Sequence, residues 1–266
     1  MKHACRDLKA EYQDLGALAG LLGHQQWQLH SAFYGWTPWD EIAHLCYFDQ
    51  TSLQSATDPE GFARDAKTLM SRIARGEEIS AVARAAFGHL DGPALLGYWR
   101  QCYERLVEVL ARLDAKARLP WYGPPMSARS FAAARLMETW AHGQDVWDVV
   151  RRKRPATARL KHIAHIGVMT FGWTFVNRGL TVPAVVPGVE LAAPDGGTWT
   201  WGDASGSDFV RGAAEDFCLL VTQRRHLDDT GLQYSPGAVQ QWLSKAQCFA
   251  GPPADGPAPG VRRVQY

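Results

Sequence analysis

The chain has 266 residues, 46% of them hydrophobic and 21% charged, and its 28 Lys and Arg residues nearly balance its 27 Asp and Glu residues. A net charge of +1 lacks the basic excess of a general nucleic-acid-binding protein, and no apolar run approaches the roughly 18 residues of a membrane span. The charged first residues predict no secretory signal. Five cysteines without a Cys-x-x-Cys pair argue against a disulfide framework or a thiolate zinc site. We therefore expect a compact cytoplasmic protein that binds neither nucleic acid nor membrane.

The first 180 residues predict a series of helices, each apolar on one side and polar on the other. The segment after Gly35-Trp36 has a clear start signal, because Thr37 can cap the helix and Pro38 suits its first position. The expected helices cover residues 4–30, 38–55, 58–75, 93–114, 129–152 and 157–178.

The pattern changes after Gly179. Two short strands are predicted at 189–193 and 198–201, joined by the turn residues 194–197. A third strand is expected at 209–212, followed by helices at 213–225 and 236–249. The fold class is therefore α+β, with a helical domain over residues 1–180 and a small α/β domain over 181–266.

One helix face of the fifth segment combines Glu138, His142 and Asp145, which are spaced at four and three residues. A carboxylate and an imidazole so spaced can take neighbouring positions around one metal ion. The same spacing is common on solvated helix surfaces, where Arg135 would pair with Glu138. Asp145 could accept a hydrogen bond from a ligand histidine or be a surface charge.

His44 lies two turns into the second helix, among apolar neighbours. It is either a buried structural histidine or, if it faces Glu138 and His142, a third metal ligand. Two nitrogens and one carboxylate oxygen would leave a zinc-like ion one open position. His162 and His165 have no carboxylate nearby in the sequence, and we interpret them as structural.

Two motifs together resemble the DinB-like metalloprotein superfamily and, within it, the mycothiol-dependent maleylpyruvate isomerase group. They are Gly35-Trp36-Thr37-x-x-Asp40-x-x-x-His44-Leu45 and Glu138-x-x-x-His142-Gly143-Gln144-Asp145. The resemblance implies a DinB-like four-helix bundle whose metal ligands are His44, Glu138 and His142. Residues 212–224 are similar to the family's second domain, a small sterol-carrier-like α/β unit.

The resemblance also implies chemistry. Its members use a divalent ion, with zinc the first choice here, and a low-molecular-weight thiol such as mycothiol as co-substrate. The reaction on a small-molecule substrate would be S-transfer or thiol exchange on a conjugate, or isomerisation of a small acid. In the family an arginine that closes the C-terminal helix is functionally important. The usual Gly-Arg is Gln223-Arg224-Arg225 here, so either Arg224 or Arg225 would inherit the catalytic role.

The chain also departs from the isomerase at residues 171–178 and 242–253, which look like a separate subfamily of metal-binding proteins. The isomerase's substrate is therefore not transferred. A second reading is a non-catalytic, metal-stabilised protein that binds a small ligand. Four protein ligands on the metal would favour this reading, whereas three ligands and a water would favour an enzyme. The sequence leaves the oligomeric state open.

Overall fold

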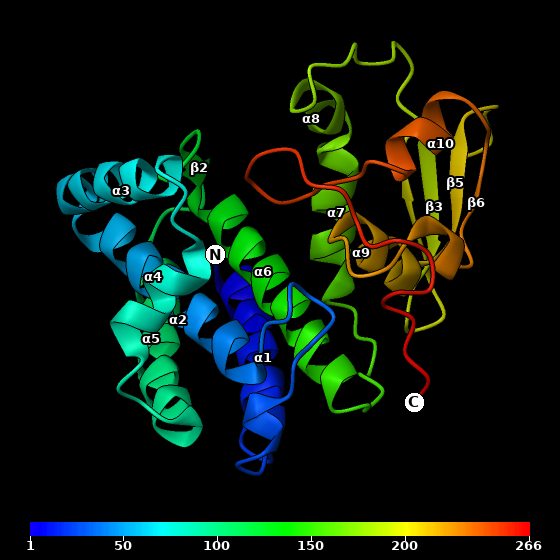
Figure 1. The fold of residues 1–266 in the computed structure, drawn as a ribbon. Coiled ribbons are helices and arrows are strands. Elements are labelled where there is room, and N and C mark those ends of the chain that lie inside the picture. Colours follow the sequence, from blue (N-terminus) through cyan, green and yellow to red (C-terminus); the bar gives the residue numbers. More distant parts are fainter. The chain divides into compact units, whose positions relative to one another are not determined.

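The computed structural model describes residues 1–266 and is α+β, with 53% helix and 8% strand. The chain divides into two compact units, residues 1–152 and 153–266 (Figure 1). The sequence predicted a boundary near residue 180, but the structure places it after Arg152. The physical reason is that α7 (Leu160–Met169) and α8 (Phe171–Val176) pack on helices that follow them in the chain.

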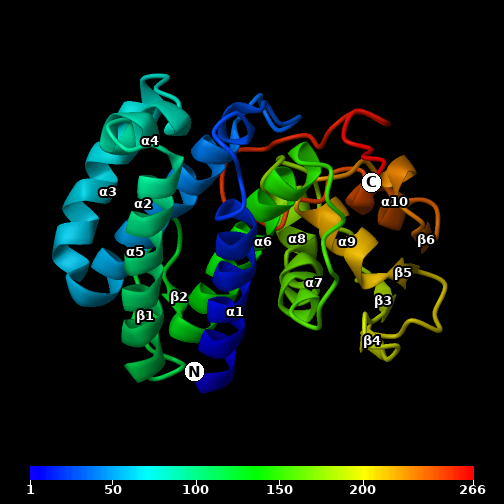
Figure 2. The ribbon, with the colours of Figure 1, turned by 90° about the horizontal axis from the view of Figure 1, so that it is seen from below.

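The first unit is a four-helix bundle in which α1 and α2 each pack on both α5 and α6. Two shorter helices, α3 and α4, pack against α2 (Figure 2), and a two-residue strand pair precedes α6. None of the helices combines the length and apolar character needed to span a membrane. The elements are α1 (Lys2–Ala19), α2 (Pro38–Thr57), α3 (Pro59–Ala74), α4 (Ile79–Phe87), α5 (Gly92–Arg112), β1 (Arg118–Leu119), β2 (Met126–Ser127) and α6 (Ala128–Val149).

The start of α2 follows the predicted cap. The Thr37 hydroxyl accepts from the Asp40 backbone N–H at 3.3 Å, and the Asp40 carboxylate accepts from the Thr37 N–H at 2.9 Å. This reciprocal capping box fixes where the helix begins and hence which way His44 points two turns later. Several helix predictions were wrong in extent. The helix predicted over 4–30 ends at Ala19, just before Gly20, the one over 157–178 is interrupted after Met169, and the one over 236–249 ends at Leu243; α4 was not predicted.

A buried carboxylate joins the four bundle helices. Asp49 on α2 accepts hydrogen bonds from Tyr12 Oη on α1 at 2.6 Å, Trp99 Nε1 on α5 at 2.8 Å and Arg135 Nε on α6 at 2.9 Å. All four side chains are buried. Burial alone would lower the pKa of Arg135, but the Asp49 carboxylate raises it above its usual value, so the guanidinium stays charged.

The second unit contains a four-stranded sheet in the order β4-β3-β5-β6, with β3 and β5 parallel and the other pairs antiparallel. The predicted hairpin and third strand are confirmed. Helix α9 packs on β3 and β5 and also on α7, where Gly167 permits a close approach, since a Cβ there would lie 2.9 Å from Phe217. The remaining elements are β3 (Gly188–Ala192), β4 (Thr198–Trp201), β5 (Phe209–Ala213), α9 (Ala214–Val221), β6 (Gln233–Tyr234) and α10 (Ala238–Leu243).

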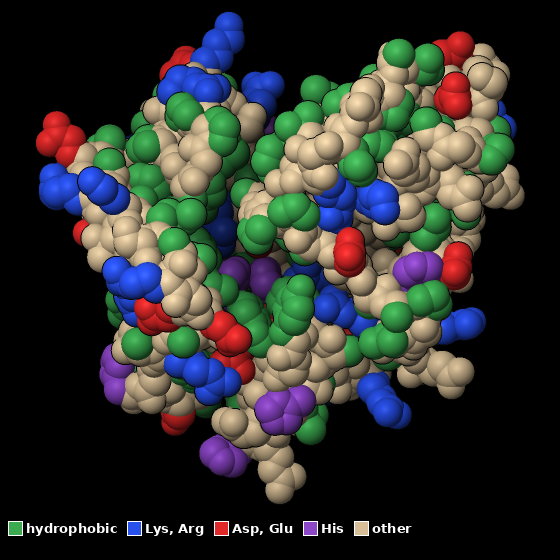
Figure 3. All heavy atoms as spheres, turned by 45° about the horizontal axis from the view of Figure 1, so that its top comes forward, with side chains coloured by type: hydrophobic (Ala, Val, Ile, Leu, Met, Phe, Trp, Pro, Cys, Tyr) green, Lys and Arg blue, Asp and Glu red, His purple; other side chains and the backbone are tan.

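Acidic and basic side chains are interspersed on the face drawn in Figure 3, as the near-zero net charge leads one to expect.

We predict that Asp49→Asn destabilises the protein by about 3–5 kcal/mol, because it leaves the Arg135 charge buried without a counter-charge. Urea denaturation followed by circular dichroism measures the change. Glu108→Gln, an exposed site on α5, is the control and should stay within about 0.5 kcal/mol of the wild type. Equal stability of the two variants would contradict the assigned importance of the Asp49 network.

Candidate metal centre

The structure brings His44, Glu138 and His142 together, although they come from helices far apart in the sequence. One ligand atom from each residue lies within 4.8 Å of the other two. The two imidazole rings have centroids 4.3 Å apart, and His142 Nε2 lies 3.4 Å from Glu138 Oε2. The three residues form a candidate metal triad at the contact of α2 with α6.

The donor set fits a divalent ion of the zinc type. Two ligands held about 2.1 Å from one tetrahedral ion lie about 3.4 Å apart, which matches the separation of His142 from Glu138. Histidine nitrogen and carboxylate oxygen are both ordinary zinc ligands. The Glu138 side chain is 25% exposed and His44 is half-buried, so the triad can be reached from solvent.

Glu41 contacts the second ring nitrogen of His142. Its carboxylate lies 2.7 Å from His142 Nδ1, and both side chains are buried. When Glu41 is ionised its oxygens can only accept hydrogen bonds, so Nδ1 would donate to Glu41 and the other ring nitrogen, Nε2, would be left for Glu138 or a metal ion. A carboxylate behind a ligand histidine fixes its tautomer and ring direction.

The sequence reasoning missed Glu41 and considered Asp145 for this role. Asp145 is buried and lies with Glu41 and His142 in a second group of close ligand atoms, so its interpretation as a surface charge is wrong. A signal for Glu41 was present, because it lies three residues before His44 on the same helix face.

The two predicted catalytic arginines lie in the second unit, just after α9, and both are buried. Arg224 Nη1 donates to the Thr222 carbonyl and Arg225 Nη1 to the Arg224 carbonyl, each at 2.8 Å. Arg225 also reaches Tyr266 Oη at 3.4 Å. Gln223 has a left-handed backbone, with φ of 59°.

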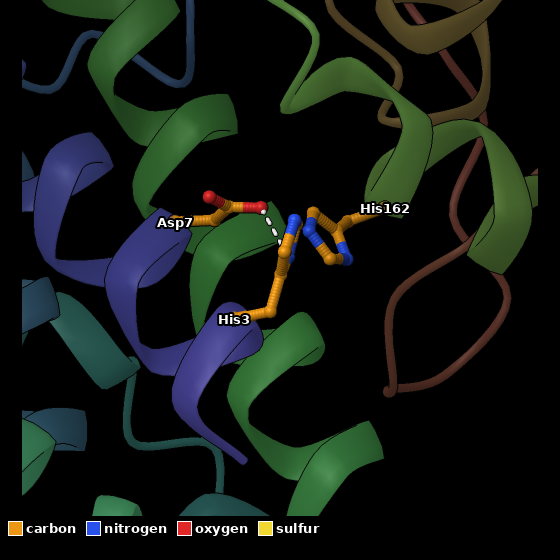
Figure 4. A group of neighbouring side chains, drawn as sticks. All are labelled: His3, Asp7 and His162. Atoms are coloured by element: carbon orange, nitrogen blue, oxygen red, sulfur yellow. Dashed lines mark ion pairs between the residues drawn. The ribbon is translucent and has the colours of Figure 1, made fainter.

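Two other histidines, His3 and His165, have contacts outside the triad. His3 forms an ion pair with Asp7 one turn along α1 at 3.1 Å (Figure 4), but its side chain is 73% exposed. This is an ordinary contact of an exposed helix surface. His165 Nδ1 accepts from Trp201 Nε1 at 3.2 Å, which agrees with a structural role.

The five cysteines are all free and buried. Cys46 is nearest to the triad in sequence, two residues after His44. A hydrogen bond with Cys102 and burial raise the pKa of the Cys46 thiol, and a protonated thiol is a poor nucleophile. The protein therefore offers no exposed thiol of its own beside the triad.

Residues 8–147 match the family model described as the mycothiol maleylpyruvate isomerase N-terminal domain. The chain belongs to this family.

Two relatives are uncharacterized proteins of Mycobacterium tuberculosis, from strains CDC 1551 and H37Rv. Each is 44% identical over 250 residues, which cover 94% of this chain and 96% of the relative. Among solved structures, the mycothiol-dependent maleylpyruvate isomerase and a mutant of it have a TM-score of 0.52 at 17% and 16% identity, covering 82% of this chain and 87% of theirs. The structural similarity shows a shared fold.

We predict that Glu41→Ala weakens binding of zinc by about 10–100-fold, because His142 then lacks the group that orients it. Competition with a chromophoric chelator measures the affinity. Glu104→Ala, at an exposed position on α5, is the matched control. Unchanged affinity in Glu41→Ala would show that Glu41 does not orient a metal ligand.

Proposed function

We propose that the protein is a divalent-metal-dependent enzyme that uses a low-molecular-weight thiol of the mycothiol type. The thiol would serve S-transfer or thiol exchange on a conjugate, or isomerisation of a small acid. The observation that carries the proposal is the convergence of the ligand atoms of His44, Glu138 and His142 within 4.8 Å. Membership of the mycothiol maleylpyruvate isomerase family supports the choice of thiol.

The chemistry of each side chain determines its proposed role around the metal ion. His44 and His142 would each present one ring nitrogen to the ion, Glu138 would supply a carboxylate oxygen, and Glu41 would hold His142 in its tautomer. A bound divalent ion lowers the pKa of a coordinated thiol, so that a thiolate exists near neutral pH. Because the protein's own cysteines are buried, the reacting thiol must come from solution.

The backbone after α9 favours Arg224 over Arg225 for the arginine role. The N–H of Gln223 donates to Leu220 O at 2.9 Å and that of Arg224 to Leu219 O at 2.7 Å. These two bonds and the left-handed Gln223 form a Schellman motif, in which glycine is usual at the left-handed position. Gln223 thus stands where the resemblance expects the glycine of Gly-Arg. Arg224 follows it and is our choice for holding a substrate carboxylate.

Accessibility favours an enzyme over a purely structural metal protein. A structural zinc ion is enclosed by four protein ligands, whereas a catalytic one keeps a position for water or substrate. The triad supplies three ligands, and its Glu138 side chain is partly exposed. We therefore propose that His44, Glu138 and His142 would hold the ion and leave it accessible to a thiol from solution.

The decisive experiment combines metal analysis with thiol-dependent turnover. His142→Ala and Glu138→Gln should each remove most of the bound metal, because the first deletes one of three ligands and the second replaces a charged carboxylate ligand by a neutral amide. Both should abolish thiol-dependent turnover. His89→Ala, an exposed histidine, should retain both. Full metal content in His142→Ala would refute the triad, and a metal-loaded wild type that is inactive with every thiol tested would refute the catalytic role.

We predict that Arg224→Ala lowers thiol-dependent turnover at least about tenfold, the usual minimum for losing a charged positioning contact, with metal content unchanged. Arg225→Ala should have a smaller effect. Thermal unfolding of both variants, together with Arg224→Lys, separates a loss of function from a loss of stability. Full activity in folded Arg224→Ala would exclude this residue.

A further inference from the structure

Five aromatic side chains from three segments of the first unit adjoin the candidate metal triad. On one side, the Phe33 and Trp36 rings have centroids 5.4 and 5.9 Å from the His142 ring, and Trp36 also lies 5.2 Å from His44. We call the set the aromatic rim; it consists of Phe33, Trp36, Phe48, Trp121 and Tyr122.

The other side of the rim begins one turn after His44. The Phe48 centroid lies 4.8 Å from the His44 ring. Trp121 and Tyr122, from the loop between β1 and β2, then contact Phe48 at 6.2 and 5.7 Å. The rim is therefore continuous with both histidines of the triad.

The rim differs from the aromatic core of the bundle in its exposure. Trp99, Tyr12 and Phe131 are almost completely buried, whereas all five rim residues are only half-buried. Ring surface left open to water is surface that can be covered favourably by an apolar partner. Beside a candidate catalytic centre, that partner is a part of the substrate.

The segment that carries Phe33 and Trp36 is already ordered by its own hydrogen bonds. Ser31 N donates to Trp36 O at 2.8 Å, Trp36 N donates to Phe33 O at 2.9 Å, and Tyr34 and Gly35 are the two left-handed residues of the turn. These rings need little reorganisation on binding, which favours affinity for a rigid partner.

The charges around the rim favour an uncharged partner. The rings carry no charge, because Phe and Trp have no titratable group and burial raises the pKa of Tyr122 to about 12, which keeps its phenol protonated. The cation on the helix face of the triad, Arg135, is balanced by Asp49 at 2.9 Å. One Arg135 nitrogen, Nη2, has no hydrogen-bond partner, so a carboxylate is the competing ligand that a test has to include.

We propose that the rim binds an uncharged aromatic group of the substrate, so that the substrate class is an aromatic electrophile or its thiol conjugate. This rests on the proposed function and selects S-transfer over isomerisation of a small acid. In the step, the thiol sulfur forms a bond to the carbon of the acceptor as the bond from that carbon to its leaving group breaks. The leaving group keeps the electron pair, and the thiol proton passes to water.

Calorimetric titration of the metal-loaded protein tests this directly, with three conjugates of mycothiol as probes: S-benzyl, S-cyclohexylmethyl and S-(2-carboxyethyl). The S-benzyl conjugate should bind at least about tenfold more tightly than the carboxyethyl conjugate, and more tightly than its saturated analogue. Trp36→Leu and Tyr122→Leu should each weaken S-benzyl binding at least about fivefold. Binding of the carboxyethyl conjugate and metal content should stay unchanged. Tyr98→Leu is the control, because the Tyr98 ring packs on Phe87 instead of the rim.

The inference is overturned if the carboxyethyl conjugate binds as tightly as the S-benzyl conjugate, or if both Leu variants keep the wild-type affinity for S-benzyl. Tyr122→Leu keeps the test valid should Trp36→Leu disturb the neighbouring histidines. If neither mycothiol nor any conjugate binds the wild type, the proposed function itself fails. The two failures are thereby distinguished.

Discussion

A single buried carboxylate, Asp49, holds the first unit in the arrangement on which its candidate site depends. It lies on α2 and receives one hydrogen bond from each of the other three bundle helices, through Tyr12, Trp99 and Arg135. A buried charge with three donors has no comparable alternative position, because any shift of a helix would leave one polar group without a partner. The network therefore sets the register between α2 and α6.

That register determines which side chains face one another. His44 lies five residues before Asp49 on α2, while Glu138 and His142 lie three and seven residues after Arg135 on α6. The Asp49–Arg135 contact thus brings the triad residues opposite each other. A second buried contact of the same two helices, between Glu41 and His142 at 2.7 Å, then fixes the direction of one ring. The same contact between α2 and α6 therefore supports both the stability of the bundle and the geometry of the triad.

In the second unit, hydrogen bonds to Gln223 hold the turn at the end of α9. Gln223 takes a left-handed conformation, which costs a non-glycine residue some strain, and its side-chain amide donates to Ala246 O at 3.1 Å and Ala254 O at 2.7 Å. Arg262 donates to the Gln223 carbonyl at 3.0 Å. These bonds to the C-terminal segment hold the turn that places Arg224. They give a physical reason why glycine is dispensable at this position.

Much of this protein follows from its sequence alone. The capped start of α2, the hairpin after residue 188 and the shared helix face of Glu138 and His142 are local properties, set by backbone preferences and by residue spacing within one element. Family resemblance added His44, on α2, as the third candidate ligand. What only the tertiary structure decided involves contacts between elements: the boundary after Arg152, the carboxylate that reaches His142, and the aromatic rim built from three separate segments. The charge and spacing of Glu41 and Asp145 are equally compatible with either as the partner of His142. The packing of α2 against α6 brings the Glu41 carboxylate to 2.7 Å from His142 Nδ1, and a distance between two helices is not encoded in the periodicity of either one.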